Sequence, residues 1–207
     1  MRIIDPSFDL VLAPTYQKAV EITEMAARTC YKSDGDEPPE EYLKRKIIKT
    51  GHHSVLEHIA ITAKIVCDRG VSHELVRHRL ASYSQSSTRY CNYSKDKFGS
   101  EITVVRPAFW PEKSRQFDKW MFSCMACETA YMQLIQDGAS AQQARSVLPN
   151  SLATTVIITA NIREWRHILK LRCSKKAHPD MEKVMTIGRD ALAQRYPVFF
   201  EDLEGEE

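Results

Sequence analysis

Three stretches of the chain carry the residue patterns of β-strands. From Ile59 to Val66, apolar and polar residues alternate, which is the period of a strand with one buried face. From Leu152 to Ala160 the chain is apolar on both faces and rich in Thr, Val and Ile, which favours a strand in the centre of a sheet. An opening strand is expected from Arg2 to Val11.

Helical periodicity and helix end signals lie between these strands. Residues Arg115 to Asp137 place apolar side chains at helical spacing before Gly138, which predicts a long core helix. Asn161, followed three residues later by Glu164, is the start signal of another helix. The predicted helices are Thr15 to Cys30, Glu40 to Thr50, a short helix capped by Ser72 and ending near Arg79, Arg115 to Asp137, a short helix opened by Ser140 and ended by Pro149, Asn161 to Arg172, and Pro179 to Tyr196.

Strands separated by helices at irregular spacing indicate an α+β fold. The alternation from Ile59 to Val66 favours a central, mostly antiparallel sheet flanked by helices. No internal repeat, low-complexity tract or linker marks a boundary, so we expect a single domain over residues 1–207.

Composition places the chain among ordinary globular proteins rather than dedicated binders of nucleic acid or membranes. No run approaches the roughly 18 apolar residues of a membrane span, and the first residues lack the apolar region of a signal peptide. Six scattered cysteines suit a reducing compartment, so a cytoplasmic location is expected. A net charge of +2 is too small for a dedicated nucleic-acid binder.

Arginines are the more informative charges, because several fall in segments that otherwise look structured. Arg77, Arg79 and Arg89 lie close together, and Arg145, Arg163 and Arg172 follow downstream. The planar guanidinium group matches phosphate oxygens two at a time, which favours small phosphorylated ligands.

The segment Arg77-His78-Arg79 through Tyr90 is the clearest candidate for chemistry. Two arginines and a histidine at a helix end repel one another unless an anion or a buried acid compensates them. The alternative interpretation is a solvated basic helix end, with Glu74 paired to His78 one helical turn away.

A second cluster, His52, His53, Glu57 and His58, invites a metal interpretation. Its spacing is one residue too long for the HxxEH pattern of zinc enzymes, and no third ligand is obvious. Helix-end and core histidines are therefore favoured, and no metal is expected.

Four segments carry a family resemblance. The sequence RHR followed by seven residues and Ser87, then Arg89-Tyr90, resembles the signature of flavin-dependent thymidylate synthases. Gly51 to His58 resembles the GHxS/TxxEH segment of that family, and Ala144 to Pro149 resembles its ARxxLP segment. Asn161, Arg163, His167 and Arg172 fall at the spacing of its C-terminal segment. The chain is thus identified as a member of this family, which implies that family's fold.

The resemblance implies a set of site residues, with Arg172 as the catalytic one. It implies FAD contacts for His52, Ser54, Arg77, His78, Arg79, Gln85, Asn161, Arg163 and His167. It implies dUMP contacts for Glu74, Arg77, Gln85, Ser86, Ser87, Thr88, Arg89, Arg145 and Arg172. Gln85 stands where some members carry Glu, and His167 where others carry Asn. These departures leave open which hydrogen bonds the two side chains make.

The implied reaction is the reductive methylation of dUMP to dTMP. The carbon comes from 5,10-methylenetetrahydrofolate, FAD delivers the hydride, and NADPH reduces the flavin. Arg172 polarises the uracil ring, in place of the usual cysteine nucleophile. The family also implies a homotetramer with active sites shared between subunits.

Three alternatives stay open at this stage. A nucleotide-binding or nucleic-acid-binding module would use the basic segment without catalysis. A related methylase would act on another uridine nucleotide. Taken singly, Arg172 suits a helix C-terminus and Asn161 suits a simple cap.

Overall fold

The computed structural model describes residues 1–203, apart from the side chain of Tyr31. The chain divides into two compact units, each assembled from separate segments of the sequence. Unit 1 consists of Met1–Ser7, Ile65–Arg77 and Ser84–Val156, and unit 2 consists of Phe8–Lys64, His78–Tyr83 and the chain from Ile157 onward. A single domain over residues 1–207 stays a prediction, and residues 204–207 lie outside the described part.

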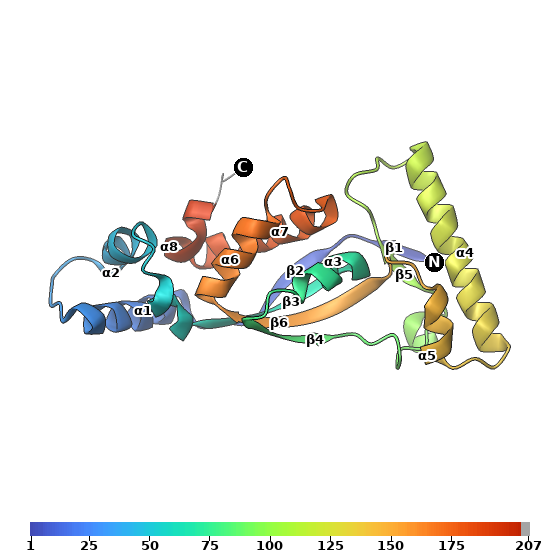
Figure 1. Ribbon diagram of the computed structural model, residues 1–207, viewed down its shortest axis with the longest axis horizontal. Helices are drawn as coiled ribbons and strands as arrows, with labels where there is room; N and C mark the ends of the chain where they lie inside the picture. The colour runs from blue at the N-terminus through green and yellow to red at the C-terminus, as the bar shows by residue number, and fades with distance from the viewer. Residues whose placement is uncertain (204–207) are drawn as a thin grey trace. The chain divides into compact units, whose positions relative to one another are not determined.

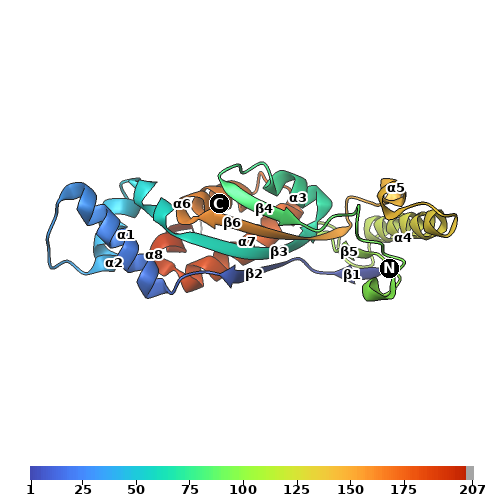
Figure 2. The same ribbon diagram turned by 90° about the horizontal axis from the view of Figure 1, so that it is seen from below.

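Four strands form a sheet in the order β2-β3-β6-β4 (Figure 2). They are β2 (Ser7–Leu12), β3 (Ala60–Asp68), β4 (Ala81–Gln85) and β6 (Ala153–Asn161). Within unit 2, the Thr62 and Thr159 hydroxyls lie 2.9 Å apart, and Ile162 N donates to Ile59 O at 2.9 Å. Pairing at both positions requires β3 and β6 to run in opposite directions. The predicted α+β fold with an antiparallel sheet flanked by helices is confirmed.

The predicted face of β3 is buried, and the strand predicted from Leu152 to Ala160 lies in the centre of the sheet as β6, between β3 and β4. On β6 the side chains alternate between buried and half-buried. The opening strand needs correction. The opening strand is broken at Pro6, which has no N–H to donate, into β1 (Arg2–Ile4) and β2. β1 pairs in parallel with β5 (Thr103–Val105) and not with the four-stranded sheet.

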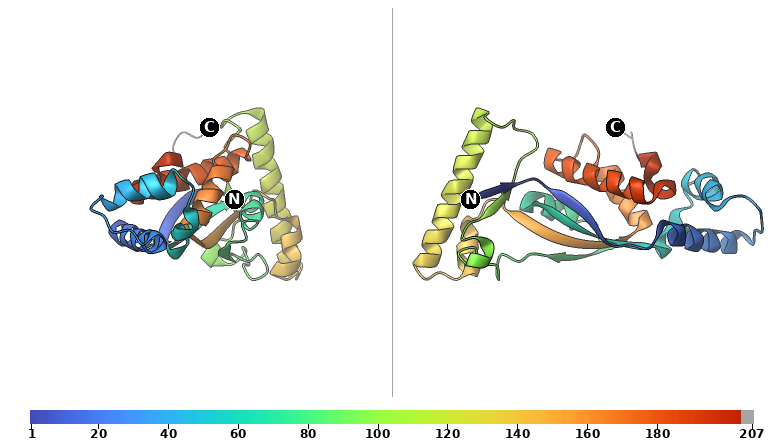
Figure 3. Two further views of the ribbon diagram at one scale, coloured as in Figure 1. Left: turned by 60° about the vertical axis from the view of Figure 1, so that its left-hand side comes forward. Right: turned by 180° about the vertical axis from the view of Figure 1, so that it is seen from behind.

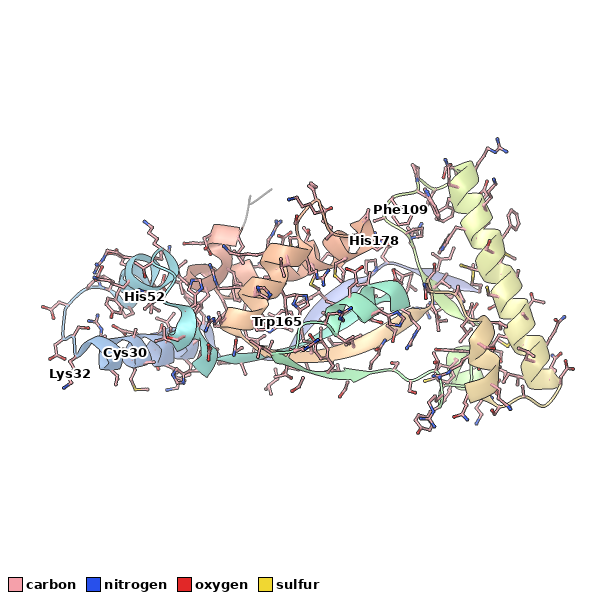
Figure 4. The ribbon with its side chains drawn as sticks, in the orientation of Figure 1. Cys30, Lys32, His52, Phe109, Trp165 and His178 are labelled. Carbon is pink, nitrogen blue, oxygen red and sulfur yellow. The ribbon has the colours of Figure 1, made fainter. Side chains whose placement is uncertain are left out.

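Unit 2 holds most of the helices. They are α1 (Tyr16–Tyr31), α2 (Pro39–Leu43), a π-helix η1 (Lys44–Ile48), a 3-10 helix η2 (His53–His58), α6 (Ile162–Arg172), α7 (Pro179–Arg195), α8 (Pro197–Phe200) and a final 3-10 turn η5 (Glu201–Leu203). α1 lies beside α2, and α6 beside α7 (Figure 1). Trp165 of α6 is fully buried and donates from Nε1 to Ile61 O at 3.0 Å, which fixes α6 on β3 (Figure 4).

α7 packs closely against β2 in unit 2. A Cβ atom at Gly188 would lie 2.6 Å from two ring carbons of Phe8. The Phe8 ring meets Trp165 edge-on, with centroids 5.5 Å apart. Only glycine therefore lets α7 approach the sheet this closely.

Unit 1 has a smaller core. Its helices are α3 (Arg69–Leu75), the 3-10 turn η3 (Asp96–Phe98), α4 (Arg115–Gln136), α5 (Ala141–Ala144) and the 3-10 turn η4 (Arg145–Val147). α5 lies beside one end of α4 (Figure 3).

The prediction of α4 as a core helix is confirmed for one face of the helix only. It buries Phe117, Cys124 and Tyr131, spaced seven residues apart, while Phe122 is 62% and Met125 46% exposed. Only a narrow stripe faces the core, because unit 1 offers little apolar surface to cover the rest. No helix among residues 1–203 is long and apolar enough to cross a membrane.

Most predicted helix ends are confirmed. Thr15 and Asn161 cap α1 and α6, and Ser140 with Gln143 forms the capping box of α5. The exception is α3, where Asp68 Oδ1 accepts from Val71 N at 2.7 Å, so Asp68 and not Ser72 is the cap. α3 also ends at Leu75, so the Arg77-His78-Arg79 segment follows the helix instead of closing it. Asp68 is both the last residue of β3 and the cap of α3. The helix therefore begins and ends earlier in the sequence than the predicted cap at Ser72 implied.

Candidate active site

In unit 2, α6 positions several predicted side chains. Asn161 Oδ1 accepts from Glu164 N at 2.9 Å and so fixes the first turn of α6. Because Trp165 anchors the buried side, Arg163 and His167 share another face one turn apart. Arg172 lies in the last turn of the same helix.

His78 and Arg172 form the centre of this site. Arg172 Nε donates to His78 Nε2 at 3.0 Å, and His78 Nδ1 lies 3.8 Å from Glu164 Oε1. Burial, the Arg172 guanidinium and His167 lower the pKa of His78 to about 4. A neutral imidazole has one acceptor nitrogen, and here that nitrogen receives the Arg172 N–H.

The electrostatic expectation for the Arg77-His78-Arg79 segment is therefore corrected. His78 is uncharged at neutral pH, so the segment carries two cations and not three. The Arg77 and Arg79 side chains are exposed and make no hydrogen bond or ion pair with the described residues. Both guanidinium groups are thus available to an anion.

A cavity of about 440 Å³ in unit 2 is lined partly by these residues. Its lining consists of Glu57, Leu80, Asn161, Arg163, Glu164 and His167. Arg163 Nη1 lies 2.5 Å from Glu57 Oε1, so the arginine already has a carboxylate partner. Three predicted flavin-binding side chains, Asn161, Arg163 and His167, meet here.

A second cavity in unit 2, of about 390 Å³, brings His52, Ser54 and Arg163 together. Figure 4 labels His52 and Cys30, which both line it. Next to them, His53 Nε2 is buried without a hydrogen-bond partner among the described residues. Burial lowers the pKa of His53, so its imidazole is mainly neutral.

These two cavities fit an elongated cofactor. Arg163 lines both of them, so they adjoin at a guanidinium that suits a pyrophosphate. The unsatisfied His53 Nε2 offers a further polar contact. Among the described residues, no three His, Cys, Asp or Glu side chains group as metal ligands.

Unit 1 contains a cavity of about 510 Å³ with a different character. Its lining consists of Arg69, Thr88, Gln142, Arg145, Ser146, Leu148, Pro149 and Asn150, with no carboxylate among these described residues. Arg145 Nη1 lies 3.5 Å from Thr88 Oγ1, a weak contact with a neutral group. An arginine pocket without an acid is suited to an anion.

The loop after β4 supplies the other predicted nucleotide contacts. Ser86 N donates to Thr155 O at 3.0 Å, which continues the strand pairing by one residue. Ser87 Oγ accepts from Arg89 N at 3.3 Å, and Arg89 Nε donates to Gln142 Oε1 at 3.1 Å. Among these contacts Ser87 has no basic group that could activate its hydroxyl, so a hydrogen-bonding role stays the prediction for Ser87.

Arg69 is the residue that sequence reasoning missed. It is half-buried at the start of α3, and its Nη1 donates to Ser86 O at 3.3 Å. The available signal was an arginine and a glycine between a predicted strand and a helix. Predicting a helix that began at Ser72 hid that signal.

The remaining predicted residues divide between the units. Glu74 is half-buried at the end of α3, where its carbonyl accepts from Arg77 N. The predicted flavin residues lie in unit 2 except Arg77 and Gln85, and the predicted nucleotide residues lie in unit 1 except Arg172. Each unit therefore carries most of one predicted binding site.

Solved structures identify the fold class first. The chain matches the crystal structure of a UMP/dUMP methylase, PolB from Streptomyces cacaoi, with a TM-score of 0.79 and 20% identity over 97% of this chain and 96% of that one. The chain therefore shares the fold of that protein.

The family follows from sequence. The family model described as thymidylate synthase complementing protein matches residues 11–198, and the chain belongs to that family. Relatives named flavin-dependent thymidylate synthase include those of Geobacter sulfurreducens, Pyrococcus furiosus and Mycobacteroides abscessus, at 43%, 34% and 32% identity. The alignments cover 74%, 75% and 88% of this chain, and 68%, 63% and 79% of the relatives. The identification made from the RHR segment is confirmed.

Proposed function

We propose that this chain is a flavin-dependent thymidylate synthase that methylates dUMP to dTMP. The observation that carries the proposal is the carboxylate-free arginine pocket of unit 1, in a chain whose family model matches residues 11–198. Most predicted nucleotide contacts lie in the same unit as that pocket, which is what a phosphorylated substrate requires.

The phosphate of dUMP would bind to Arg145 and Arg69, with hydroxyl groups beside them. Thr88 already contacts Arg145, and Ser87 and Arg89 lie in the same turn after β4. Charge-assisted hydrogen bonds contribute about 1.5–3 kcal/mol each, so two arginines supply a large part of the affinity for a nucleotide.

FAD would be held by the two adjoining cavities of unit 2. Arg163 would meet its phosphates, and Asn161, His167, His52 and Ser54 would supply polar contacts to the rest. The exposed Arg77 and Arg79 and the predicted Gln85 contact extend that set. When bound, reduced FAD supplies the hydride that completes the methyl group.

Arg172 would polarise the uracil ring. Its Nε is fixed by neutral His78 at 3.0 Å, so the guanidinium is held in place without a histidine cation beside it to oppose its charge. A fixed positive group at the ring edge stabilises negative charge that develops when carbon 5 attacks. Carbon 5 would attack the methylene carbon of 5,10-methylenetetrahydrofolate as one methylene–nitrogen bond breaks. Loss of the carbon 5 proton to solvent would then accompany cleavage of the second methylene–nitrogen bond, so that tetrahydrofolate leaves and the methylene group is ready to accept the hydride.

A cysteine nucleophile is not required for this route. Burial raises the pKa of Cys67 to about 12 and that of Cys124 to about 11, and burial also raises the pKa of Cys173. These three thiols are therefore protonated and poor nucleophiles at neutral pH. Activation by Arg172 agrees with that chemistry.

The proposal includes NADPH as the reductant of the flavin, a homotetramer with shared active sites, and the cytoplasm as its location. A chain of 23.8 kDa has little room to enclose FAD, dUMP and folate by itself. The exposed Phe122 and Met125 of α4 supply apolar surface for association between subunits. Thiols without disulfide partners suit a reducing compartment.

The deciding experiment is a single turnover of the reduced protein. Purified protein should be yellow, with a flavin absorbance maximum at about 450 nm. Reduced anaerobically and mixed with 5,10-methylenetetrahydrofolate, it should be reoxidised only when dUMP is present, with formation of dTMP. Bound flavin without dUMP-dependent turnover would reject the proposal, and a colourless protein would favour a nucleotide-binding module. Faster turnover of UMP would assign a different uridine nucleotide.

A further inference from the structure

Gln85, at the end of β4, makes two hydrogen bonds to buried hydroxyl groups within unit 1. Its Nε2 lies 2.8 Å from Ser72 Oγ and 3.2 Å from Thr154 Oγ1. Ser72 is 0% and Thr154 3% exposed, whereas Gln85 is half-buried. One side of the amide therefore faces the interior, and the other is directed away from these two hydroxyl groups.

The hydrogen bonds of Ser72 determine which side is which. Ser72 Oγ donates its only proton to Arg69 O at 2.9 Å. It can meet Gln85 only as an acceptor, so the group facing it must be the NH₂ of the amide. If the amide were rotated by half a turn, its oxygen would face an oxygen without an available proton.

The opposite side of the amide is then an acceptor. Gln85 Oε1 makes no hydrogen bond with the described residues, and the side chain is not fully covered. A glutamine normally offers both a donor and an acceptor to a ligand. Here both amide protons are directed at Ser72 and Thr154, so only the acceptor is left.

We propose that Ser72 and Thr154 are positioning residues that turn Gln85 into an acceptor-only contact, which selects nucleotides carrying a donor at that point. The inference rests on the proposed function, because it assigns polarity to a predicted contact with dUMP. Two groups of dUMP have this chemistry, the N3–H of the uracil ring and the 3′-hydroxyl of the sugar. Each of them has a proton to donate, and one of the two meets Gln85 Oε1.

The test compares ligands that lack one donor each. We would measure dissociation constants by calorimetry for dUMP, N3-methyl-dUMP and 2′,3′-dideoxy-UMP on the flavin-loaded protein. The wild type should bind one of the two analogues about tenfold more weakly than dUMP, since a neutral hydrogen bond is lost. That analogue identifies which donor Gln85 meets.

The variant S72A/T154V removes both interior acceptors and frees the amide to rotate. The tenfold preference for the donor should fall to about twofold or less, because the amide can then present either group. T154S keeps the hydroxyl and should keep the preference. T155V, on the same strand but with its side chain on the opposite face, is the matched control and should behave as the wild type. If S72A/T154V does not fold, S72A alone gives the same comparison with one acceptor removed.

Two results would overturn the inference. In the first, the wild type binds dUMP and makes dTMP, yet both analogues bind as tightly as dUMP. In the second, S72A/T154V or S72A retains the full tenfold preference. A wild-type protein that binds no dUMP would reject the proposed function instead, so the two failures are distinguishable.

Discussion

The arginines of the two units differ in the hydrogen-bond partners that surround them: carboxylates in unit 2 and neutral oxygens in the unit 1 pocket. In unit 2, Arg163 pairs with Glu57 at 2.5 Å and Arg166 pairs with Asp202 at 2.6 Å. In the unit 1 pocket, the hydrogen bonds of the Arg69 and Arg145 guanidinium groups within residues 1–203 go only to a carbonyl and a hydroxyl oxygen. A buried guanidinium that the fold neutralises, such as that of Arg166, serves structure, whereas one that the fold leaves uncompensated is suited to binding an anion. Arg163 stands between the two, because its pair with Glu57 is exposed and its guanidinium can still meet a phosphate.

Loss of the Arg166 anchor should have the largest effect. Arg166 is 3% exposed and also donates to Phe199 O, so it ties α8 to α6. Arg166→Met should lower the free energy of unfolding by about 3–5 kcal/mol, as expected when a buried pair loses one partner. Urea unfolding measures this change. Arg45→Met breaks an exposed pair with Glu37 and should lower the free energy of unfolding far less, because solvent screens exposed pairs. Equal losses in the two variants would show that Arg166 is no anchor.

Arg172 tests whether a positioned arginine of unit 2 acts in catalysis. Arg172→Ala should stay yellow but lose roughly 2–4 kcal/mol of transition-state stabilisation, the range for one preorganised donor. Arg172→Lys should recover little, because an ammonium group lacks the planar fork. Single-turnover oxidation at saturating dUMP and folate gives the rate, with exposed Arg115→Ala as control. A wild-type rate for Arg172→Ala would move activation to Arg89 or Arg145.

The neutral His78 that orients Arg172 should also be visible in the pH dependence of stability. Its pKa is about 4 in the folded protein and ordinarily 6.5, so between these pH values the unfolded chain binds more protons. Unfolding free energy should therefore fall by about 2–3 kcal/mol as the pH drops from 6.5 to 4, then level off. Urea unfolding of wild type and His78→Gln over that range isolates this contribution from that of His53. A constant difference between the two proteins would mean that His78 titrates alike in both states.

The uncompensated arginines of unit 1 should give smaller effects, confined to the phosphate. Arg145→Ala and Arg69→Ala should each weaken dUMP binding by about tenfold or more, the loss of one charge-assisted contact. Neither should change the affinity for deoxyuridine, which has no phosphate. Calorimetry with both ligands measures the two effects. If Arg69→Ala weakened deoxyuridine equally, Arg69 would act through the loop that it ties to Ser86.

Local signals in the sequence predicted much of the fold. Thr15, Ser140 and Asn161 act as caps because a cap depends on residues within one helical turn. The narrow buried stripe of α4 was not predictable, since periodicity does not say how much surface another segment will cover.

The candidate site was predictable to a similar degree. Family spacing identified Asn161, Arg163 and His167, which the structure brings to one cavity. It did not reveal Arg69 or the neutrality of His78. Both properties arise from burial and from neighbours distant in sequence, which residue types at fixed spacing do not encode.

The close approach of α7 to β2 has a consequence for the history of the family. Because a Cβ at Gly188 would overlap the Phe8 ring, neither position can change size alone. We expect related sequences to covary here, with alanine or serine at the position of Gly188 accompanied by a smaller side chain at that of Phe8. The residues at these two positions would then indicate, for each relative, the distance between α7 and β2.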